Sequence, residues 1–318
     1  LMAEFLNVPY TTVAAAAAIP ALLYFFGIFA GVHFEAKKLG LRGLPRRELP
    51  KFLYILRTEG INFIPLVAII VLLTSSGFSL LRIALLATAS AVLAPVVLFL
   101  ARLAWIVVAG KAPAWAAARP TRVSTAGRFA FDSLKAGVVQ FFEALIKGAR
   151  SALGVATACA LAGVIVGVVT RTGLGLKLAS ALVDIANGRL LLTMVFTMLT
   201  SIILGMGVPT TANYIITSTI AAPALLMLGV AALPAHLFVF YFGIIADLTP
   251  PVALAAYAGA AIARGNPFKT GVTATRLAIG AFILPYIFVA SPQLLLIGAT
   301  WHGILLAVLT AVVGMTAI

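Results

Sequence analysis

An apolar stretch of the chain is interrupted at residues 205–211 by the run Gly-Met-Gly-Val-Pro-Thr-Thr. Its glycines and its proline lower helix propensity and remove one backbone donor, so a regular helical hydrogen-bond ladder is not expected here. Lipid cannot replace the lost hydrogen bonds, and open backbone inside a membrane is tolerated only where it lines a cavity or binds a ligand. In secondary transporters that ligand is a small solute or a coupling ion. This first break therefore indicates transport.

The residues of the first break suit a cation and an anion together. Sodium prefers several hard oxygen ligands, and an interrupted helix offers them as backbone carbonyls and threonine hydroxyls. The half-helix expected from about Thr210 onward carries partial positive charge at its N-terminus, which suits a substrate carboxylate. The predicted ion ligands are Gly205, Met206, Gly207, Val208, Thr210 and Thr211. The predicted substrate contacts are Pro209, Thr210, Thr211, Asn213 and Tyr214. The alternative is a Gly-Pro kink in which Thr210 caps a new helix turn.

A second break, Asp-Leu-Thr-Pro-Pro at residues 247–251, follows in the next apolar stretch. Its adjacent prolines leave the carbonyls before them without helical donors. A charge at the bilayer centre costs on the order of several kcal/mol, so Asp247 should face protein or water, where it can ligate the ion. The alternative for Asp247 is a helix-capping or interfacial carboxylate paired with an arginine. We predict further ion ligands at Asp247, Thr249 and Pro250, and we expect the two breaks to meet near mid-membrane.

The composition indicates an all-α polytopic membrane protein. Hydrophobic residues make up 63% of the 318 residues, charged residues 9%, and the mean hydropathy is +1.17. The formal charge of +14 alone could suggest nucleic acid, but the basic residues lie in short connections between apolar spans, so no nucleic acid is expected as a partner. A single cysteine, Cys159, excludes a disulfide framework.

The chain is predicted to form about 8 membrane segments, because about 20 apolar residues cross a bilayer. Residues 1–130 contain the N-terminal spans and basic cytoplasmic loops, residues 131–150 form an amphipathic helix lying in the membrane surface, and residues 151–318 form a transport-type region. The expected continuous spans are 12–32, 61–74, 80–108, 152–170, 273–290 and 293–316. A shorter amphipathic piece is expected at 171–187, and the broken stretches are 190–230 and 236–263.

The positions of the basic loops constrain the two broken stretches. Arg171, Lys177 and Arg189 are expected outside and the loop with Arg264 and Lys269 inside, which requires an odd number of crossings between them. One broken stretch is then a re-entrant hairpin and the other a discontinuous helix. We favour residues 190–230 as the hairpin, because arms of about 15 residues span only about 22 Å. The reverse assignment stays open.

Four stretches of the chain resemble a known transporter family: residues 204–214, 221–224, 235–243 and 247–257. They are similar to the large membrane subunit of tripartite ATP-independent periplasmic (TRAP) transporters, closest to the fused permeases that work with TAXI-type binding proteins. The resemblance implies an elevator-type transporter, driven by a sodium gradient, that takes an organic anion from a soluble periplasmic binding protein. It also implies a location in a bacterial or archaeal cytoplasmic membrane.

The family resembles two inverted halves, each with a hairpin and a discontinuous helix, and one such pair is visible here. We therefore expect half of an elevator-type fold, with a small membrane subunit or a missing N-terminal half of the permease as partner. The first residue is not methionine, which suggests a fragment or a split subunit. A non-transporting scaffold or inactive fragment is the alternative function. A channel is a third interpretation, which predicts solute flux without sodium or a soluble partner.

Motifs of enzymes and of metal sites are missing from the sequence. There is no Gly-x4-Gly-Lys-Ser/Thr phosphate loop, no His-Glu-x-x-His motif and no serine elbow, so an enzyme is not expected. The dispersed histidines His33, His236 and His302 do not predict a metal site. Sodium is the only expected ion, and no cofactor is predicted. In a family of this type, the soluble binding protein does much of the substrate selection.

Overall fold

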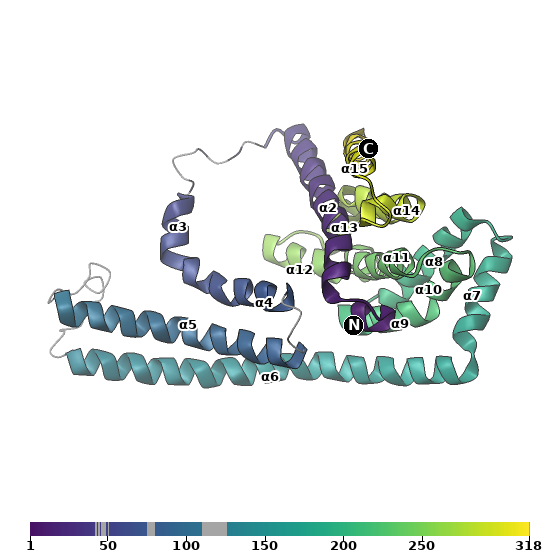
Figure 1. The fold of residues 1–318 in the computed structure, drawn as a ribbon. Helices are drawn as coiled ribbons and strands as arrows, with labels where there is room; N and C mark the ends of the chain where they lie inside the picture. Colours follow the sequence, from purple (N-terminus) through teal and green to yellow (C-terminus); the bar gives the residue numbers. More distant parts are fainter. Residues whose placement is uncertain are drawn as a thin grey trace. The chain divides into compact units, whose positions relative to one another are not determined.

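The computed structural model describes residues 1–41, 43, 45, 49, 51–74, 80–109 and 126–317. Every regular element within these residues is a helix, which confirms the predicted all-α class for the described part of the chain. The chain divides into two compact units, Leu1–Arg42 with Leu153–Ile318 and Gly43–Ala152. Each unit is described by itself, and Figure 1 gives the labels of the helices.

One side of the first unit is built on the long helix α2 (Tyr10–Lys38), which contains the expected span 12–32. It begins after Pro9, whose fixed φ suits a helix start, and it ends with Lys37 and Lys38 in the last turn, where positive charge is favourable. The helix packs against α14 (Ile279–Ala290) and α15 (Trp301–Ala317), drawn in yellow in Figure 1. The short helix α1 (Met2–Leu6) precedes it.

The broken stretch 190–230 folds as a reversal of the chain. Its first arm is α8 (Leu190–Gly205), and its returning arm is α9 (Thr210–Ile220) followed by α10 (Ala222–Met227). Helix α7 (Leu174–Ile185) contacts both arms (Figure 1). It packs on α8, which follows it in the chain, and on α10 at the end of the returning arm. This is the geometry of a hairpin with its tip at the first break.

Helix α11 (Ala232–Ile245) is the centre of the first unit, since it contacts α8, α9, α10 and α14. Phe238 and Phe242 are fully buried on it and stack edge-on at 4.8 Å. The chain continues through the 3-10 turn η2 (Ala246–Leu248) into the second break and then α12 (Leu254–Ala263) and α13 (Pro267–Leu277). Both rings contact Tyr286 of α14, at 5.4 Å from Phe238 and 5.9 Å from Phe242, so their burial holds α11 against α14.

The second unit contains α3 (Phe52–Glu59), the 3-10 turn η1 (Gly60–Phe63), α4 (Ile64–Thr74) and α5 (Leu80–Ala109). Helices α4 and α5 pack on each other, as expected for the paired spans 61–74 and 80–108. The turn between them at residues 75–79 lies outside the described residues.

Helix α6 (Ala126–Thr172) runs without interruption through the expected boundary at residue 151. The predicted surface helix 131–150 and the predicted span 152–170 therefore form one helix, and the flat orientation of the first part stays a prediction. An amphipathic segment and an apolar segment both favour helix, and the residues joining them contain no proline to end it.

Three described helical segments are long and apolar enough to cross a membrane: Tyr10–Lys38, Phe141–Thr172 and Pro267–Ala290. The last one begins earlier than the expected span 273–290 and consists of α13 and α14, joined at Ala278. The expected span 293–316 is not one helix. It is divided into the 3-10 turn η3 (Pro292–Leu295) and α15, because Leu296 and Gly298 between them have positive φ. The number of membrane segments stays a prediction.

Candidate functional site

The first break separates α8 from α9 by residues 206–209. Met206 is extended with φ −61° and ψ 115°, and Gly207 has a φ of 72°. Only glycine adopts such a φ without strain, so Gly207 is needed for the path of the chain. Helix α9 then begins at Thr210, directly after Pro209. The predicted interruption is confirmed, and its position matches the sequence run from Gly205 to Thr211.

Several backbone carbonyl oxygens at this break have no hydrogen-bond donor within the described part of the chain, and they are called open below. The carbonyl of Gly205 accepts from the amide of Val208 at 3.3 Å, and that of Pro209 accepts from the amide of Asn213 at 2.9 Å. Among the described residues, the carbonyls of residues 206–208 accept no hydrogen bond. The amides of residues 210–212 likewise donate none in this part of the chain. Open carbonyls and open amides therefore lie on consecutive residues, which suits a cation at the carbonyls and an anion at the start of α9.

Thr210 does not cap α9. Pro209 occupies the N-cap position, and no side chain accepts a hydrogen bond from the first turn. Thr210 is therefore not the cap that the alternative interpretation expects, whereas the Gly-Pro kink of that interpretation is present. The exposed side chain of Thr210 and the half-buried one of Thr211 make no hydrogen bond with the described residues, so both hydroxyls are available to a ligand.

Asn213 and Tyr214 lie behind the break with their side chains buried, at 2% and 3% exposure. The amide of Asn213 is wedged between two backbones, since a β-carbon at Gly205 would lie 2.9 Å from its Nδ2 and one at Gly243 only 2.6 Å from it. The hydroxyl of Tyr214 bonds with Nδ1 of His236 at 2.9 Å. Their predicted contact with substrate stays a prediction, and what the structure shows is packing behind the tip.

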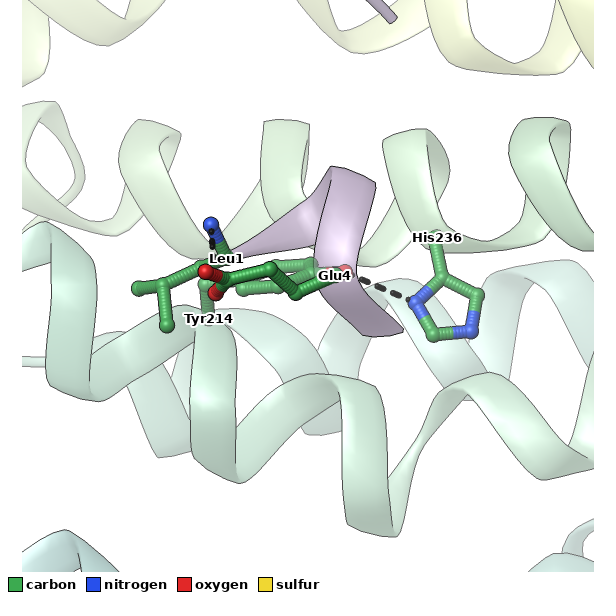
Figure 2. A network of polar contacts seen from close by, with 4 residues as sticks. All are labelled: Leu1, Glu4, Tyr214 and His236. Carbon is green, nitrogen blue, oxygen red and sulfur yellow. Dashed lines mark hydrogen bonds and ion pairs between the residues drawn. The ribbon is translucent and has the colours of Figure 1, made fainter. Parts of the chain in front are cut away.

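Figure 2 shows the surroundings of the Tyr214–His236 bond. The figure also shows Glu4 of α1, which forms an ion pair with the amino group of Leu1 at 3.3 Å (Figure 2). Phe5 packs edge-on against the ring of Tyr214 at 5.7 Å. Helix α1 therefore packs on α2 and α11 and touches the returning arm through Phe5. His236 is the buried member of the dispersed histidines, and its Nδ1 bonds to the hydroxyl of Tyr214.

The second break is more completely hydrogen-bonded than the sequence suggests. The carbonyl of Leu248 accepts from Oγ1 of Thr275 at 3.0 Å, and that of Pro251 accepts from the hydroxyl of Tyr257 at 2.7 Å. The carbonyl of Thr249, expected to be open ahead of the prolines, accepts from the amide of Ala253 at 3.1 Å. Ala253 itself has a positive φ of 34°, and α12 begins at the next residue. The carbonyl of Pro250 accepts no hydrogen bond among the described residues.

Asp247 and Thr249 line the second break as half-buried residues. Asp247 forms no ion pair within the described part of the chain, so the alternative in which it pairs with an arginine finds no partner there. The hydroxyl of Thr249 donates to the carbonyl of Ile245 at 2.9 Å, which leaves its lone pairs available. Each carbonyl oxygen also has a second lone pair, so the bonded carbonyl of Thr249 can still accept a cation.

The structure brings the two breaks together. A β-carbon at Gly207 would lie 3.7 Å from Cγ1 of Val252, and α8 contacts η2. Met206 from the first break and Leu248 from the second pack against the same hydrophobic core. The predicted ion ligands therefore come from two neighbouring interruptions, whereas Asn213 and Tyr214 lie on the buried side of α9.

Several supporting residues were missed by the sequence analysis. Thr275 bonds to the second break from α13, and a β-carbon at Gly271 on the same helix would lie 3.2 Å from Cγ of Pro250 and 3.3 Å from Cε1 of Tyr257. The glycine inside a helical pattern was a usable signal, because it marks a close approach. Thr275 offered no signal, since a threonine in a helix usually bonds to its own backbone.

No group of three or more histidine, cysteine, aspartate or glutamate side chains gathers anywhere in the described ranges. A cation site among these residues would therefore contain at most two such side chains, with carbonyls and hydroxyls as its other ligands. Such oxygen ligands suit a hard cation rather than a transition metal that prefers imidazole or thiolate ligands.

A comparison with protein families gives one match. The model of the DctM component of the tripartite ATP-independent periplasmic transporter matches residues 1–302. The match covers α1 to the first residues of α15 and includes both breaks. The comparisons with curated proteins and with solved structures give no match.

Proposed function

Because the chain belongs to the DctM component family of tripartite ATP-independent periplasmic transporters, we propose that it is a sodium-coupled permease subunit that imports a small organic acid. Membership makes the chain a transporter permease of the membrane rather than an enzyme. The coupling ion and the acid are part of the proposal.

The open carbonyls of the first break carry the proposal for sodium. Residues 206–208 present carbonyls without donors, and the half-buried carboxylate of Asp247 belongs to the break that lies beside them. A dehydrated sodium ion needs several oxygen ligands, and carbonyls without a donor are free to supply them. The proposed ligand set also includes the carbonyls of Gly205 and Pro250 and the hydroxyls of Thr210, Thr211 and Thr249.

The start of α9 is the proposed position of the substrate carboxylate. The amides of residues 210–212 point out of the helix start without acceptors among the described residues, and a helix N-terminus favours negative charge. Pro209 and Thr210 are exposed there, and Thr211 is half-buried. A sodium ion at the carbonyls directly before this start would raise the affinity for the anion, because the two charges attract across a short distance.

Members of this family work with a periplasmic binding protein and a small membrane subunit. We propose that this chain takes its acid from such a binding protein, in a bacterial or archaeal cytoplasmic membrane. We also propose that the hairpin of α8 and α9 is re-entrant, and that it moves together with the discontinuous helix of α11 and α12 as one rigid unit in an elevator-type cycle. The contacts of α11 with both arms support this unit.

The double variant Thr210→Val and Thr211→Val tests the site, because valine has nearly the shape of threonine but lacks the hydroxyl. The melting temperature of the intact permease is measured in sodium chloride and in choline chloride, and uptake of labelled mono- and dicarboxylates is measured in proteoliposomes with the binding protein and the small subunit. We expect sodium to stabilise the wild type, and the double variant to need about tenfold more sodium, the loss of about 1.4 kcal/mol of ligand interactions.

Thr310→Val on α15 is the matched control. Its exposed hydroxyl bonds to the carbonyl of Leu306 at 2.8 Å, so its loss should change neither sodium stabilisation nor uptake. An unchanged sodium requirement in the double variant would overturn the assignment of the site. Uptake without sodium or without a binding protein would overturn the coupled mechanism and favour a channel.

A further inference from the structure

One face of α8 carries a row of buried hydroxyl groups. Thr193, Thr197 and Ser201 follow each other at intervals of four residues, and each is 0% exposed. Gly205 is the next position of this row and ends the helix at the first break. Residues four apart lie on the same face of an α-helix, so the row runs from the break along the inside of the first hairpin arm. That face is buried where α8 packs against α9 and α11.

The hydroxyls of this row differ in their partners. Oγ1 of Thr193 donates to the carbonyl of Arg189 at 3.1 Å, the usual bond of a threonine inside a helix. Thr217 on α9 makes the same kind of bond, to the carbonyl of Asn213 at 2.9 Å. Oγ1 of Thr197 and Oγ of Ser201 make no hydrogen bond with the described residues, although both atoms are buried. Their rotamers therefore direct the hydroxyls away from the backbone of their own helix.

A third buried oxygen without a partner in the described chain lies at the break end of the row. It is Oδ1 of Asn213, whose amide is packed against Gly205. The order of the oxygens from the break inward is thus Asn213, Ser201 and Thr197. A buried polar atom without a hydrogen bond is costly, and native proteins rarely retain such atoms in a group. A ligand bonded to all three atoms removes this cost.

The spacing of the row fits water. Four residues of helix rise by about 6 Å. Two hydrogen bonds of about 2.8 Å span nearly the same distance, so one water molecule between Ser201 and Thr197 can bond to both. A second water between Asn213 and Ser201 would be placed in the same way, because Asn213 packs at the next position of the row. Each water then has at least two polar partners, as buried waters require.

The chemistry of the three oxygens favours water over a cation. They belong to two hydroxyls and one amide, and none carries a negative charge. A cation would accept lone pairs only and would leave the hydrogens of Thr197 and Ser201 without acceptors. Water both donates and accepts, so it satisfies hydroxyls and the amide oxygen alike. Asp247 is not part of this row, because it belongs to η2 at the second break.

We propose that the row Asn213–Ser201–Thr197 is an internal water-binding site that hydrates the contact of the first hairpin arm with α9 and α11. The bound waters connect the back of the first break to the interior of the arm. The proposal goes beyond the transport function, because it requires neither sodium nor substrate. Through these waters, α8 makes hydrogen-bonded contacts with its neighbours inside an otherwise apolar core. The waters can exchange, so these contacts can break and form again.

Thr197→Val tests the site, with Thr193→Val as the matched control. Valine has the shape of threonine without the hydroxyl, and both positions are fully buried on the same face. The melting temperature of each variant is measured for the intact permease in sodium chloride and in choline chloride. We expect Thr197→Val to melt lower by about 2–4 °C in both salts, because the water loses one partner. Thr193→Val should melt close to wild type, since the carbonyl of Arg189 still accepts from the amide of Thr193.

Three other results would overturn the proposal. A higher melting temperature of Thr197→Val would show that the hydroxyl is dry, because removing an unpaired polar group stabilises a core. A loss of stability in sodium chloride alone would identify the ligand as the cation. A structure of the permease at a resolution that reveals ordered water provides the independent measurement: density within hydrogen-bond distance of both Thr197 and Ser201 is expected, and its absence there would refute the site.

Discussion

The side-chain amide of Asn213 lies directly against the backbone of Gly243. A β-carbon at residue 243 would be 2.6 Å from Nδ2 and 2.7 Å from Oδ1 of this amide. Gly205 approaches the same amide from the end of α8, where a β-carbon would also lie 2.7 Å from the carbonyl oxygen of Gly243. One amide thus fixes the closest approach of α8, α9 and α11, and both glycines are required because no larger residue leaves room for it.

Gly243→Ala should disrupt this contact. The added methyl group would overlap the amide of Asn213 and force α11 away from the hairpin tip, which costs about 1–3 kcal/mol in a packed core. We expect a lower melting temperature and a loss of sodium-dependent uptake beyond the loss of folded protein. Both are measured on purified permease in proteoliposomes.

Gly259→Ala on α12 is the control for this prediction. Nothing lies within 4 Å of the position of its β-carbon, so alanine there should leave stability unchanged or raise it slightly through helix propensity. Equal behaviour of the two variants would contradict the role given to the close approach at Gly243.

Thr275 lies on α13, outside the two breaks, and we expect its hydrogen bond to the second break to influence the sodium affinity. Its Oγ1 lies 3.0 Å from the carbonyl of Leu248 and equally far from that of Gly271. Thr275→Val removes this donor and frees the carbonyl of Leu248 beside the proposed ion, which should change the sodium concentration for half-maximal uptake by about fivefold, equivalent to about 1 kcal/mol. Thr275→Ser keeps the hydroxyl and should behave as wild type. A similar effect of both variants would indicate that the methyl group, not the hydrogen bond, matters.

Tyr214→Phe separates a packing role from a substrate role. The variant keeps the ring contacts with Phe5 and Phe240 but removes the hydroxyl bonded to His236. Because that hydroxyl is buried, we expect a loss of about 1–2 kcal/mol in the free energy of unfolding and an unchanged apparent KM for the transported acid. Thermal unfolding and uptake kinetics measure the two quantities. A raised KM with unchanged stability would instead support the predicted contact of Tyr214 with substrate.

The sequence predicted the positions of the interruptions well, because glycine and proline act locally. Gly207 needs a positive φ, and Pro209 directly precedes α9, so both features follow from single residues and their neighbours. The start of α2 was predicted within two residues, but the helix continues six residues beyond the expected end at residue 32, to Lys38. The continuity of α6 was missed, because a change from amphipathic to apolar pattern does not end a helix.

The partners of open backbone groups could not be predicted, because they depend on segments distant in sequence. Thr275 reaches the carbonyl of Leu248 across 27 residues, and Tyr214 finds His236 across 22. The unpaired hydroxyls of Thr197 and Ser201 were equally hidden, since their four-residue spacing is the same as that of the self-bonded Thr193. Tertiary packing decides which hydroxyl turns to its own helix and which turns away.

Removal of sodium should loosen the hairpin tip specifically. The proposed ion joins carbonyls of residues 206–208 to the second break, so its loss removes one of the interactions that hold the two interruptions together. We expect amide hydrogen exchange in residues 203–215 to rise on the order of tenfold in choline chloride relative to sodium chloride. Peptides from α15, which contact neither break, should exchange equally in both salts. A uniform change along the chain would indicate a general salt effect and contradict a sodium site at the tip.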